Sequence, residues 1–547
     1  MEINLSEDKI KKDEQLWNQL AESGVFGGKR ICYGTSGFRF HNSCLDYIVY
    51  RVGFFVALIS KKHSPKSWGV MITASHNPKE DNGVKIINER AGMMEVEFEA
   101  LLEGFVNNRD LSAAMKELIN SIFGDNEAQF SMTSFVQVGT DTRESAERLK
   151  HLLMESAALM NCKVIDNGYL ATPHLYYIVN AFNKHKSIAE STSHDIKLEY
   201  FVDYGARYLE IMEAMGVSNN PARVIDCANG AGYLSVRAFL DNSLKATHDV
   251  RLINTTDKAK LNESCGAEHV HKFKLLPDNF PSDALYGITL DGDADRMIYF
   301  INHPNELELI DGDKTSALLA KLVLKICKEV FGLFDINFGV VMTNYSNFGL
   351  KEYLNKIGVE YRLSETGVKY AHDKAAQYDI GIFFESNGHG ALLIKPSFLE
   401  KLKPRVDFNN KEHLIAWKIL SFTNNLTGDG VFNILQTEIA LRYLKMSVED
   451  FASIFVYKKF KTYKLKVKNK LAVVTDEVKG IALAPKDLQP FIDELYLKHP
   501  SYNSRIFIRP SGTEDILRIH IEADKEDQIA NLQAEVDKYI YGHGEIN

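Results

Sequence analysis

Short apolar runs alternate with amphipathic stretches along the first three hundred residues. Helical spacing of apolar side chains predicts helices at 95–106 and 144–160. The apolar runs that predict strands lie at 68–73, 135–139, 163–166, 223–227 and 288–290. This alternation is typical of βαβ units with mostly parallel sheets, in which ligands bind at loops after the carboxyl ends of strands.

The pattern changes beyond a weak junction near 427–430. The elements predicted there are strands at 463–468, 505–509 and 516–522, a helix at 488–497 and a terminal helix from Lys525. Such a segment predicts a compact α+β unit of its own. A polar stretch at 183–194 predicts a surface loop or a second junction. With 547 residues, the chain is long enough for three to five domains.

Composition and charge exclude several classes of protein. The 64 basic and 73 acidic residues give a net charge of −9, which argues against a nucleic-acid partner. The lysines at 459–468 alternate with other residues, and from Lys464 on they predict the solvated face of an edge strand rather than a nucleic-acid stripe. Six cysteines without a C-x-x-C pair predict neither a disulfide framework nor structural zinc. No signal peptide or membrane span is expected, so the predicted compartment is the cytoplasm.

A first polar loop, TASHNP at 73–78, directly follows the predicted strand at 68–73. A serine between small residues is expected to expose its hydroxyl there, and Ser75 would relay a phosphoryl group as a phosphoserine. A Ser–His hydrolase is the rival interpretation. Adjacent residues on an extended loop point apart, however, so Ser75 and His76 are poorly placed as nucleophile and base. An ordinary Asn-Pro turn is the non-functional alternative.

A second loop carries three carboxylates at alternate positions, Asp291, Asp293 and Asp295, followed by Arg296. If the loop turns at Gly292, the three can converge on one hard cation such as Mg²⁺. The spacing does not fit an EF-hand. A solvated acidic turn remains an alternative, as does a phosphatase in which Asp291 itself is phosphorylated.

Two further loops, and one smaller signal, complete the candidate chemistry. ESNGHG at 385–390 offers groups suited to sugar hydroxyls, although an ordinary turn explains it equally well. RPSGT at 509–513, with Arg518 nearby, gathers an arginine, hydroxyls and a glycine into an anion cradle. The loop GTSGFR at 34–39 presents Arg39 and is uninformative alone.

Taken together and in this order, the four loops resemble those of the α-D-phosphohexomutase superfamily. TASHNP with DNGVK, ETGVK at 365–369, the E-x-N-G-H-G sugar loop and RPSGTED are most similar to the phosphoacetylglucosamine mutases within it. The resemblance runs from about Cys32 to Ala523. Ser36 and Ser386 stand where the family has alanine, and 110–130 and 397–410 match no family motif.

The resemblance implies an α/β protein of three related mixed α/β domains plus a smaller C-terminal α+β domain around a central cleft. The implied domains are a phosphoserine (catalytic) domain at 1–182, a metal-binding domain at 183–302, a sugar-binding domain at 303–430 and a C-terminal phosphate-binding domain at 431–547. The implied reaction interconverts N-acetylglucosamine 6-phosphate and N-acetylglucosamine 1-phosphate on the route to UDP-N-acetylglucosamine. One Mg²⁺ per chain, a sugar 1,6-bisphosphate as activator and intermediate, and a monomer are expected.

The resemblance also implies residue roles. Ser75 accepts and returns the phosphoryl group, and its phosphate shares the metal with Asp291, Asp293 and Asp295. Arg39, Lys85 and Arg296 stabilise the transferring group, with Lys85 or His76 moving the proton. The sugar is bound by Glu385, Ser386, Asn387 and His389, and the non-reacting phosphate by Arg509, Pro510, Ser511, Gly512, Thr513 and Arg518. The alternatives are a phosphoglucomutase or phosphomannomutase, a Mg²⁺-dependent sugar phosphatase using Asp291, and a non-catalytic sugar-phosphate-binding relative.

Overall fold

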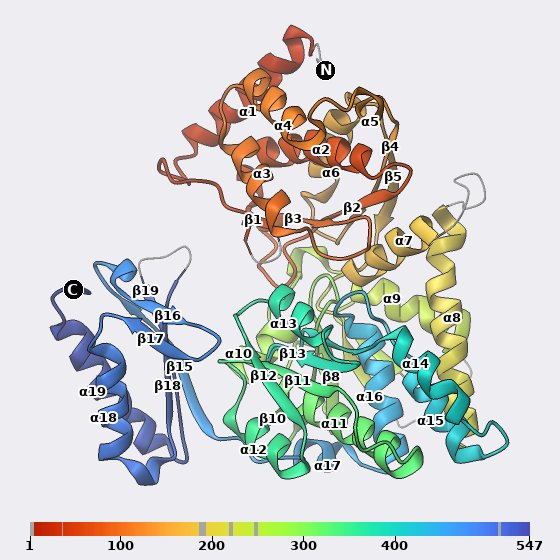
Figure 1. The fold of residues 1–547 in the computed structure, drawn as a ribbon, viewed down its shortest axis with the longest axis vertical. Helices are drawn as coiled ribbons and strands as arrows, with labels where there is room; N and C mark the ends of the chain where they lie inside the picture. The colour runs from red at the N-terminus through yellow and green to blue at the C-terminus, as the bar shows by residue number, and fades with distance from the viewer. Residues whose placement is uncertain (1–4, 35–36, 185–192, 218–222, 245–249, 512–515) are drawn as a thin grey trace. The chain divides into compact units, whose positions relative to one another are not determined.

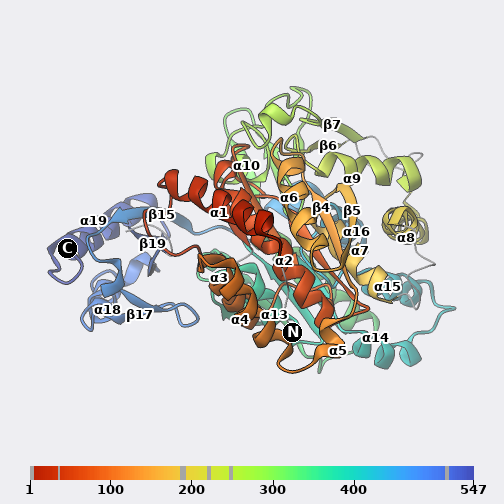
Figure 2. The same ribbon diagram turned by 90° about the horizontal axis from the view of Figure 1, so that it is seen from above.

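The structure is a computed structural model. It describes residues 5–34, 37–184, 193–217, 223–244, 250–511 and 516–547. The chain forms two compact units, each with its own sheets (Figures 1 and 2). Unit 1 comprises residues 1–309 and 424–442, and unit 2 comprises 310–423 and 443–547.

Unit 1 begins with a five-stranded sheet of order β1-β3-β2-β4-β5. Its strands are β1 (Phe38–His41), β2 (Ser67–Ile72), β3 (Asp81–Ile87), β4 (Ser134–Thr140) and β5 (Cys162–Tyr169). Its helices are α1 (Glu7–Glu22), α2 (Leu45–Lys62), α3 (Val96–Asn107), α4 (Leu111–Phe123), α5 (Glu127–Phe130), α6 (Ala146–Ala158) and α7 (Thr172–Lys184). Segment 110–130, which matched no family motif, is therefore mainly the helices α4 and α5.

Side chains alternate between the two faces of this first sheet. Val70 and Ile72 of β2 pack in the core shared with α2 and α6, whereas Met71 packs on the opposite face with α7. Figure 2 shows α2 and α6 side by side over this sheet. By length and composition Asn42–Lys62 could cross a membrane, but 89% of its most apolar window is buried. That burial is the packing of a core helix.

The second sheet of unit 1 has the order β10-β9-β8-β6-β7. Its strands are β6 (Arg223–Asp226), β7 (Val250–Ile253), β8 (Tyr286–Leu290), β9 (Met297–Asn302) and β10 (Leu307–Ile310). Its helices are α8 (Ser193–Ala214), α9 (Gly232–Phe239), α10 (Ala267–Phe273) and α16 (Gly430–Leu444), the last contributed by the returning segment 424–442.

Unit 2 contains the third sheet and the C-terminal sheets. The third sheet, β12-β11-β13-β14, consists of β11 (Phe338–Thr343), β12 (Glu360–Ser364), β13 (Ile380–Phe384) and β14 (Gly390–Ile394). Its helices are α11 (Gly312–Leu324), α12 (Phe348–Ile357), α13 (Val368–Ala375), α14 (Pro396–Leu402) and α15 (Lys411–Ser421).

The C-terminal part of unit 2 is α+β, as its pattern predicted. A sheet of order β15-β19-β18 and a hairpin β16-β17 consist of β15 (Lys459–Lys466), β16 (Val474–Asp476), β17 (Ile481–Ala484), β18 (Arg505–Pro510) and β19 (Ile516–Ala523). The helices are α17 (Val448–Ala452), α18 (Leu488–Lys498) and α19 (Glu526–Gly542). Helices α18 and α19 lie beside this sheet and share its core (Figure 1).

The first three sheets share one spatial order. In each sheet, two antiparallel strands of a hairpin are followed, across the sheet, by two parallel strands. The spatial orders are β3-β2-β4-β5, β9-β8-β6-β7 and β14-β13-β11-β12. In the second and third sheets the hairpin comes last in the chain, whereas in the first it precedes its parallel strands. The prediction of an α/β fold with three related domains and a C-terminal α+β domain is confirmed, and the domain boundaries at 182, 302 and 430 stay predictions.

Candidate active site

Three of the four predicted loops occupy equivalent places in these sheets. The loop of Ser75 joins β2 to β3, the aspartate loop joins β8 to β9, and the loop at 385–389 joins β13 to β14. Each is thus the turn of the hairpin at the side of its sheet, at the carboxyl end of a parallel strand, where ligands of α/β proteins bind.

The hydroxyl of Ser75 is hydrogen-bonded to the aspartate loop. Its Oγ donates to Asp291 Oδ2 at 2.6 Å, and its backbone N–H donates to Thr73 Oγ1 at 2.9 Å. The residue has a left-handed φ of 55°, and its side chain is fully buried. The expectation of an exposed hydroxyl is therefore wrong in this structure, because the aspartate loop covers Ser75.

Asp291, Asp293 and Asp295 converge as their spacing predicted. One oxygen from each lies within 4.8 Å of the others, and all three side chains are buried. The loop turns through Gly292, with Ala294 N–H donating to Asp291 C=O at 3.0 Å. Burial, and then the charges of Asp295 and Asp293, raise the pKa of Asp291 well above its usual value. Three crowded carboxylates are stable as anions only if cations surround them.

Two basic side chains supply part of that charge. Lys85 Nζ donates to Asp293 Oδ2 at 2.6 Å and to Asp295 Oδ2 at 2.7 Å. Although burial opposes it, the attraction of these carboxylates raises the pKa of the Lys85 ammonium. Arg296 Nε lies 3.7 Å from Asp291 Oδ2. Arg39, which interacts electrostatically with all three aspartates, is a third cation beside the cluster.

The donor set fits a hard divalent cation. Asp293 Oδ2 accepts from both Lys85 and Thr172, whereas Asp293 Oδ1 is buried with no hydrogen-bond partner among the described residues. A buried carboxylate oxygen left without a donor is costly. Three aspartates would provide half of the six oxygen ligands that Mg²⁺ prefers.

The remaining predicted catalytic residues lie in the same electrostatic environment. Burial, then Arg296 and Arg39, lower the pKa of His76 far below its usual value, so its imidazole is neutral. Arg39, on the edge strand β1, has its guanidinium pKa lowered by burial and by Arg296. The structure therefore brings Ser75, the three aspartates and all four predicted cationic or imidazole side chains together within unit 1.

The predicted sugar loop lies in unit 2 and is tightly turned. Asn387 Nδ2 donates to Glu385 Oε2 at 3.0 Å, and its Oδ1 accepts from His389 N–H at 3.0 Å. A Cβ on Gly312 would lie 2.0 Å from Glu385 C=O, so the loop packs directly on the start of α11. Glu385, Ser386 and Asn387 are half-buried and His389 is buried.

The predicted phosphate loop places two arginines opposite each other. Arg509 on β18 and Arg518 on β19 are cross-strand partners, and like charges in that relation repel. Arg509 Nε donates to Tyr345 Oη at 2.9 Å, and its Nη1 lies 3.6 Å from Glu477 Oε1. A buried Ser511 follows the half-buried Pro510, whereas Gly512 and Thr513 lie outside the described residues.

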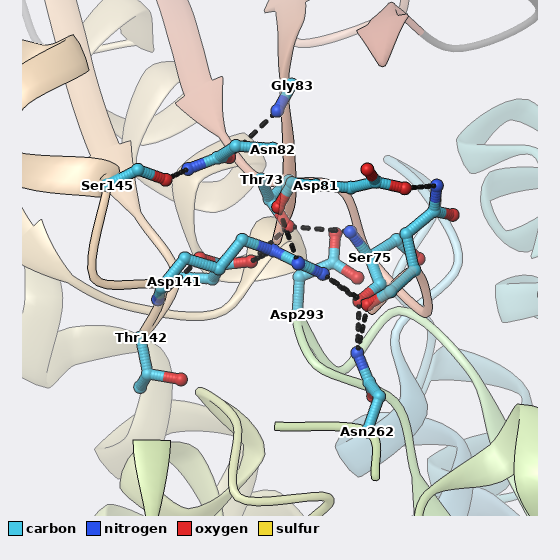
Figure 3. Close-up of polar contacts among 12 residues, drawn as sticks. Thr73, Ser75, Asp81, Asn82, Gly83, Asp141, Thr142, Ser145, Asn262 and Asp293 are labelled. Atoms are coloured by element: carbon cyan, nitrogen blue, oxygen red, sulfur yellow. Dashed lines mark hydrogen bonds and ion pairs between the residues drawn. The ribbon is translucent and has the colours of Figure 1, made fainter. Parts of the chain in front are cut away.

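Sequence reasoning missed the residues that hold these loops. Thr172 contacts Asp293, and Arg143 contacts the Ser75 loop. Asp141 and Asn262 also contact that loop (Figure 3). The one signal in the sequence was weak: Asp141 and Arg143 directly follow the predicted strand at 135–139. Thr172 and Asn262 carry no signal, because only the fold brings them to the site.

Comparisons with known proteins place this sequence among related families. Residues 311–446 match the family described as Phosphoacetylglucosamine mutase AMG1, domain III. Residues 55–199 match the Phosphoglucomutase/phosphomannomutase alpha/beta/alpha domain I, and 464–539 match the C-terminal domain of that family. The phosphoacetylglucosamine mutase of Candida albicans is 31% identical over 533 residues, which cover 94% of this chain and 96% of that protein.

Solved structures from Aspergillus fumigatus share the whole fold. The N-acetylphosphoglucosamine mutase in complex with GlcNAc-6P and magnesium has a TM-score of 0.85 at 28% identity, covering 96% of this chain and 98% of that one. A variant in complex with glucose 1,6-bisphosphate has a TM-score of 0.84 at 27% identity, covering 97% and 99%. By sequence and by fold, this chain therefore belongs to the phosphoacetylglucosamine mutases, isomerase-class enzymes of the α-D-phosphohexomutase superfamily.

Proposed function

We propose that this chain interconverts N-acetylglucosamine 6-phosphate and N-acetylglucosamine 1-phosphate through a phosphoserine at Ser75 and a sugar bisphosphate intermediate. The observation that carries the proposal is the Ser75 hydroxyl, 2.6 Å from Asp291 in a buried three-aspartate cluster. In each direction Ser75 gives its phosphoryl group to the sugar phosphate, and the bisphosphate turns around and returns its other phosphate to Ser75.

Charge neutralisation around Ser75 supports this chemistry. Phosphoryl transfer depends mainly on positioning and on stabilising the charge of the transferring group. Arg39, Lys85 and Arg296 supply positive charge beside the buried aspartates. Lys85 and His76 are the two candidates for moving the proton of the sugar hydroxyl.

Asp291, Asp293 and Asp295 would hold one Mg²⁺ together with the phosphate of Ser75. When bound there, the cation supplies positive charge to the phosphoryl oxygens and orients them. The magnesium in the Aspergillus complex supports this assignment for a related protein. Lys85 keeps Asp293 and Asp295 side by side by donating to both of them.

The loops of unit 2 are proposed to bind the substrate. Glu385, Ser386, Asn387 and His389 would bind sugar hydroxyls, as their family counterparts imply. Arg509 and Arg518 lie opposite each other on neighbouring strands, and an anion between them would relieve their repulsion. We assign the non-reacting phosphate to these arginines, with Pro510, Ser511, Gly512 and Thr513.

The wider setting follows from the proposed reaction. We place the product on the route to UDP-N-acetylglucosamine, in the cytoplasm, and expect a monomer with a sugar 1,6-bisphosphate as activator. Nucleic acid and membrane are not proposed as partners, because the chain is acidic and, among the residues that the structure describes, the one helix long and apolar enough to span a membrane is a core helix.

Replacement of Ser75 tests the proposal. Ser75→Ala is expected to lose nearly all mutase activity, while Ser131→Ala, at an exposed serine, keeps wild-type activity. The Tm of Ser75→Ala should fall by only a few degrees, since one hydrogen bond to a charged group contributes about 1.5–3 kcal/mol. The measurements are a coupled mutase assay, thermal unfolding and a phosphopeptide map.

Two outcomes would contradict the assignment. Activity of Ser75→Ala within about tenfold of wild type, a loss of only ~1.4 kcal/mol, would exclude the phosphoserine. Steady release of inorganic phosphate by wild-type protein that carries no phosphate on Ser75 would instead favour the phosphatase that uses Asp291.

A further inference from the structure

The backbone carbonyls of Ser75 and Asn77 are each held by two donors. Arg143 Nη2 donates to both at 2.9 Å, and Asn262 Nδ2 donates to Ser75 C=O at 2.9 Å and to Asn77 C=O at 3.0 Å. A carbonyl oxygen has two lone pairs, so both acceptors are fully used. We call these two carbonyls with Arg143 and Asn262 the carbonyl clamp (Figure 3).

Arg143 makes the clamp rigid. Its Nη1 donates to Asp81 C=O at 2.7 Å and to Pro78 C=O, and its Nε donates to Asp141 Oδ2 at 3.0 Å. The side chain is completely buried, so all of its donor groups are committed to this loop and to Asp141. A guanidinium presents its donors in a fixed planar fork, which fixes the acceptors relative to one another.

Asn262 reaches the same carbonyls from a distant segment, between β7 and α10. A Cβ on Gly292 would lie 2.6 Å from Ser75 C=O and 2.9 Å from Asn262 Nδ2, so the aspartate loop packs directly against the clamp. The clamp therefore joins the serine loop, the segment of Asn262 and the loop after β4 that carries Arg143, and the aspartate loop packs against it.

Ser75 needs such support because its conformation is unfavourable. A residue with a Cβ at φ 55° persists only where its surroundings determine it. The clamp fixes the C=O of Ser75 and Thr73 fixes its N–H, so the direction of the Cα–Cβ bond is set before any substrate binds. That direction points Oγ at Asp291.

We infer that Arg143 and Asn262 are positioning residues for phosphoryl transfer, which hold Ser75 in the one backbone conformation that directs its oxygen at the aspartate cluster. The inference rests on the proposed phosphoserine. Neither side chain touches a carboxylate of Asp291, Asp293 or Asp295 through a hydrogen bond that the described residues show, so both act through the backbone of Ser75.

Two Asn262 variants separate positioning from packing. Asn262 itself has a left-handed φ of 57°, which glycine and aspartate both tolerate. Asn262→Gly removes the donor, and Asn262→Asp keeps the shape but turns an acceptor toward two carbonyls. Arg143→Lys keeps the charge beside Asp141 and loses the fork.

Thr142→Val is the matched control. Thr142 Oγ1 donates to Asn229 C=O at 3.1 Å, a contact that ties the loop after β4 to the second sheet and does not involve the serine loop. A general loosening of these segments would affect this variant as much as the Asn262 variants.

The experiment follows single-turnover phosphorylation of Ser75 by glucose 1,6-bisphosphate, with Mg²⁺ present, by intact-protein mass. We expect the rate of Ser75 phosphorylation to fall about tenfold or more in Asn262→Gly, and further in Asn262→Asp. The half-saturating bisphosphate concentration should stay within about twofold of wild type. Thr142→Val should stay within about threefold of the wild-type rate.

Rates of both Asn262 variants within about threefold of wild type, or an equal loss in Thr142→Val, would overturn the inference. If Arg143→Lys does not fold, the two Asn262 variants still test whether the clamp positions Ser75. A wild-type protein that gains no phosphate on Ser75 would overturn the proposed function, and the inference with it, whereas a phosphorylated wild type with equally fast variants overturns the inference alone.

Discussion

At the scale of single residues, Asp293 shows how one carboxylate can serve two purposes. Its Oδ2 accepts from Thr172 Oγ1 at 2.5 Å and from Lys85 Nζ at 2.6 Å, which leaves Oδ1 for a cation. The Thr172 hydroxyl thus orients Asp293, a proposed metal ligand, without itself being one. Such outer partners typically contribute tenfold to a hundredfold to metal affinity.

Thr172→Val replaces this hydroxyl with a methyl group of the same shape. We expect Mn²⁺ binding, measured by electron paramagnetic resonance on the unphosphorylated protein, to weaken about tenfold. Thr172→Ser keeps the donor and should bind within about twofold of wild type. Equal affinity of the valine variant and wild type would show that the contact with Thr172 does not orient Asp293.

Motifs in the sequence predicted the candidate reacting groups, whereas the residues that hold these groups in place were not predicted. Ser75 and the aspartates stand in short motifs whose residue types suit their chemistry. Burial of Ser75 was not predictable, because the covering Asp291 lies 216 residues away along the chain. Arg143 and Asn262 are ordinary polar residues until the fold brings their donors to two particular carbonyls.

At the scale of elements, the aspartate loop depends on Gly292, because the space beside its Cα is too small for a side chain. A Cβ on Gly292 would lie 2.6 Å from Ser75 C=O, which is closer than such atoms approach in real structures. By contrast, a Cβ on Gly104, exposed within α3, would meet nothing within 4 Å.

Gly292→Ala should therefore lower kcat more than tenfold and the unfolding free energy by about 1–3 kcal/mol, because the serine and aspartate loops must move apart. Gly104→Ala should keep full activity and stabilise the protein by about 0.4–1 kcal/mol. Mutase assays and thermal unfolding of both variants are the measurements. Full activity of Gly292→Ala would mean that the two loops can separate without consequence.

The strands and helices that the sequence pattern predicted lie within a few residues of elements in the structure. The predicted strand at 68–73 is β2 (Ser67–Ile72), and the predicted helix at 488–497 is α18. The lysine strand β15 lies at the edge of its sheet, with Lys464 and Lys466 exposed on either side of a buried Leu465, as period two indicated. The common strand order of the three sheets could not be predicted from the sequence. In the first sheet the hairpin precedes its parallel strands in the chain, whereas in the other two it follows them, and the three hairpin loops share few residues.

At the scale of the whole molecule, helix α16 completes unit 1 although the surrounding chain belongs to unit 2. Gly430 N–H donates to Ala294 C=O at 2.9 Å in the aspartate loop, and Glu438 pairs with buried Arg223 at 2.6 Å. The predicted border at 430 lies inside this returning segment. The sequence pattern could not reveal that the chain returns to unit 1 here, because an apolar helix has the same pattern whichever unit it packs in.

Asp429, which directly precedes α16, makes the packing of this helix in unit 1 sensitive to pH. It accepts from Tyr200 Oη and from Phe432 N–H, and burial raises its pKa from 3.8 to about 6. The folded state therefore binds a proton more tightly than the unfolded state. Stability from this group is fully present below pH 3.8 and falls as the pH rises through 6.

Asp429→Asn removes the titration and keeps an acceptor for Phe432 N–H. Relative to this variant, wild type should lose stability between pH 4 and 7, by at most about 3 kcal/mol for a shift of roughly two pKa units. Thermal unfolding of both proteins across this range measures the difference. Parallel curves of Tm against pH would contradict the prediction.

The returning segment also sets an order in time during synthesis. Residues 310–423 leave the ribosome before 424–442 can reach unit 1. At about 5–20 residues per second, that delay lasts roughly 6 to 23 s. Throughout it, Arg223 lacks Glu438 and the Ala294 carbonyl lacks Gly430, so the nascent aspartate loop is complete in sequence well before it is complete in structure.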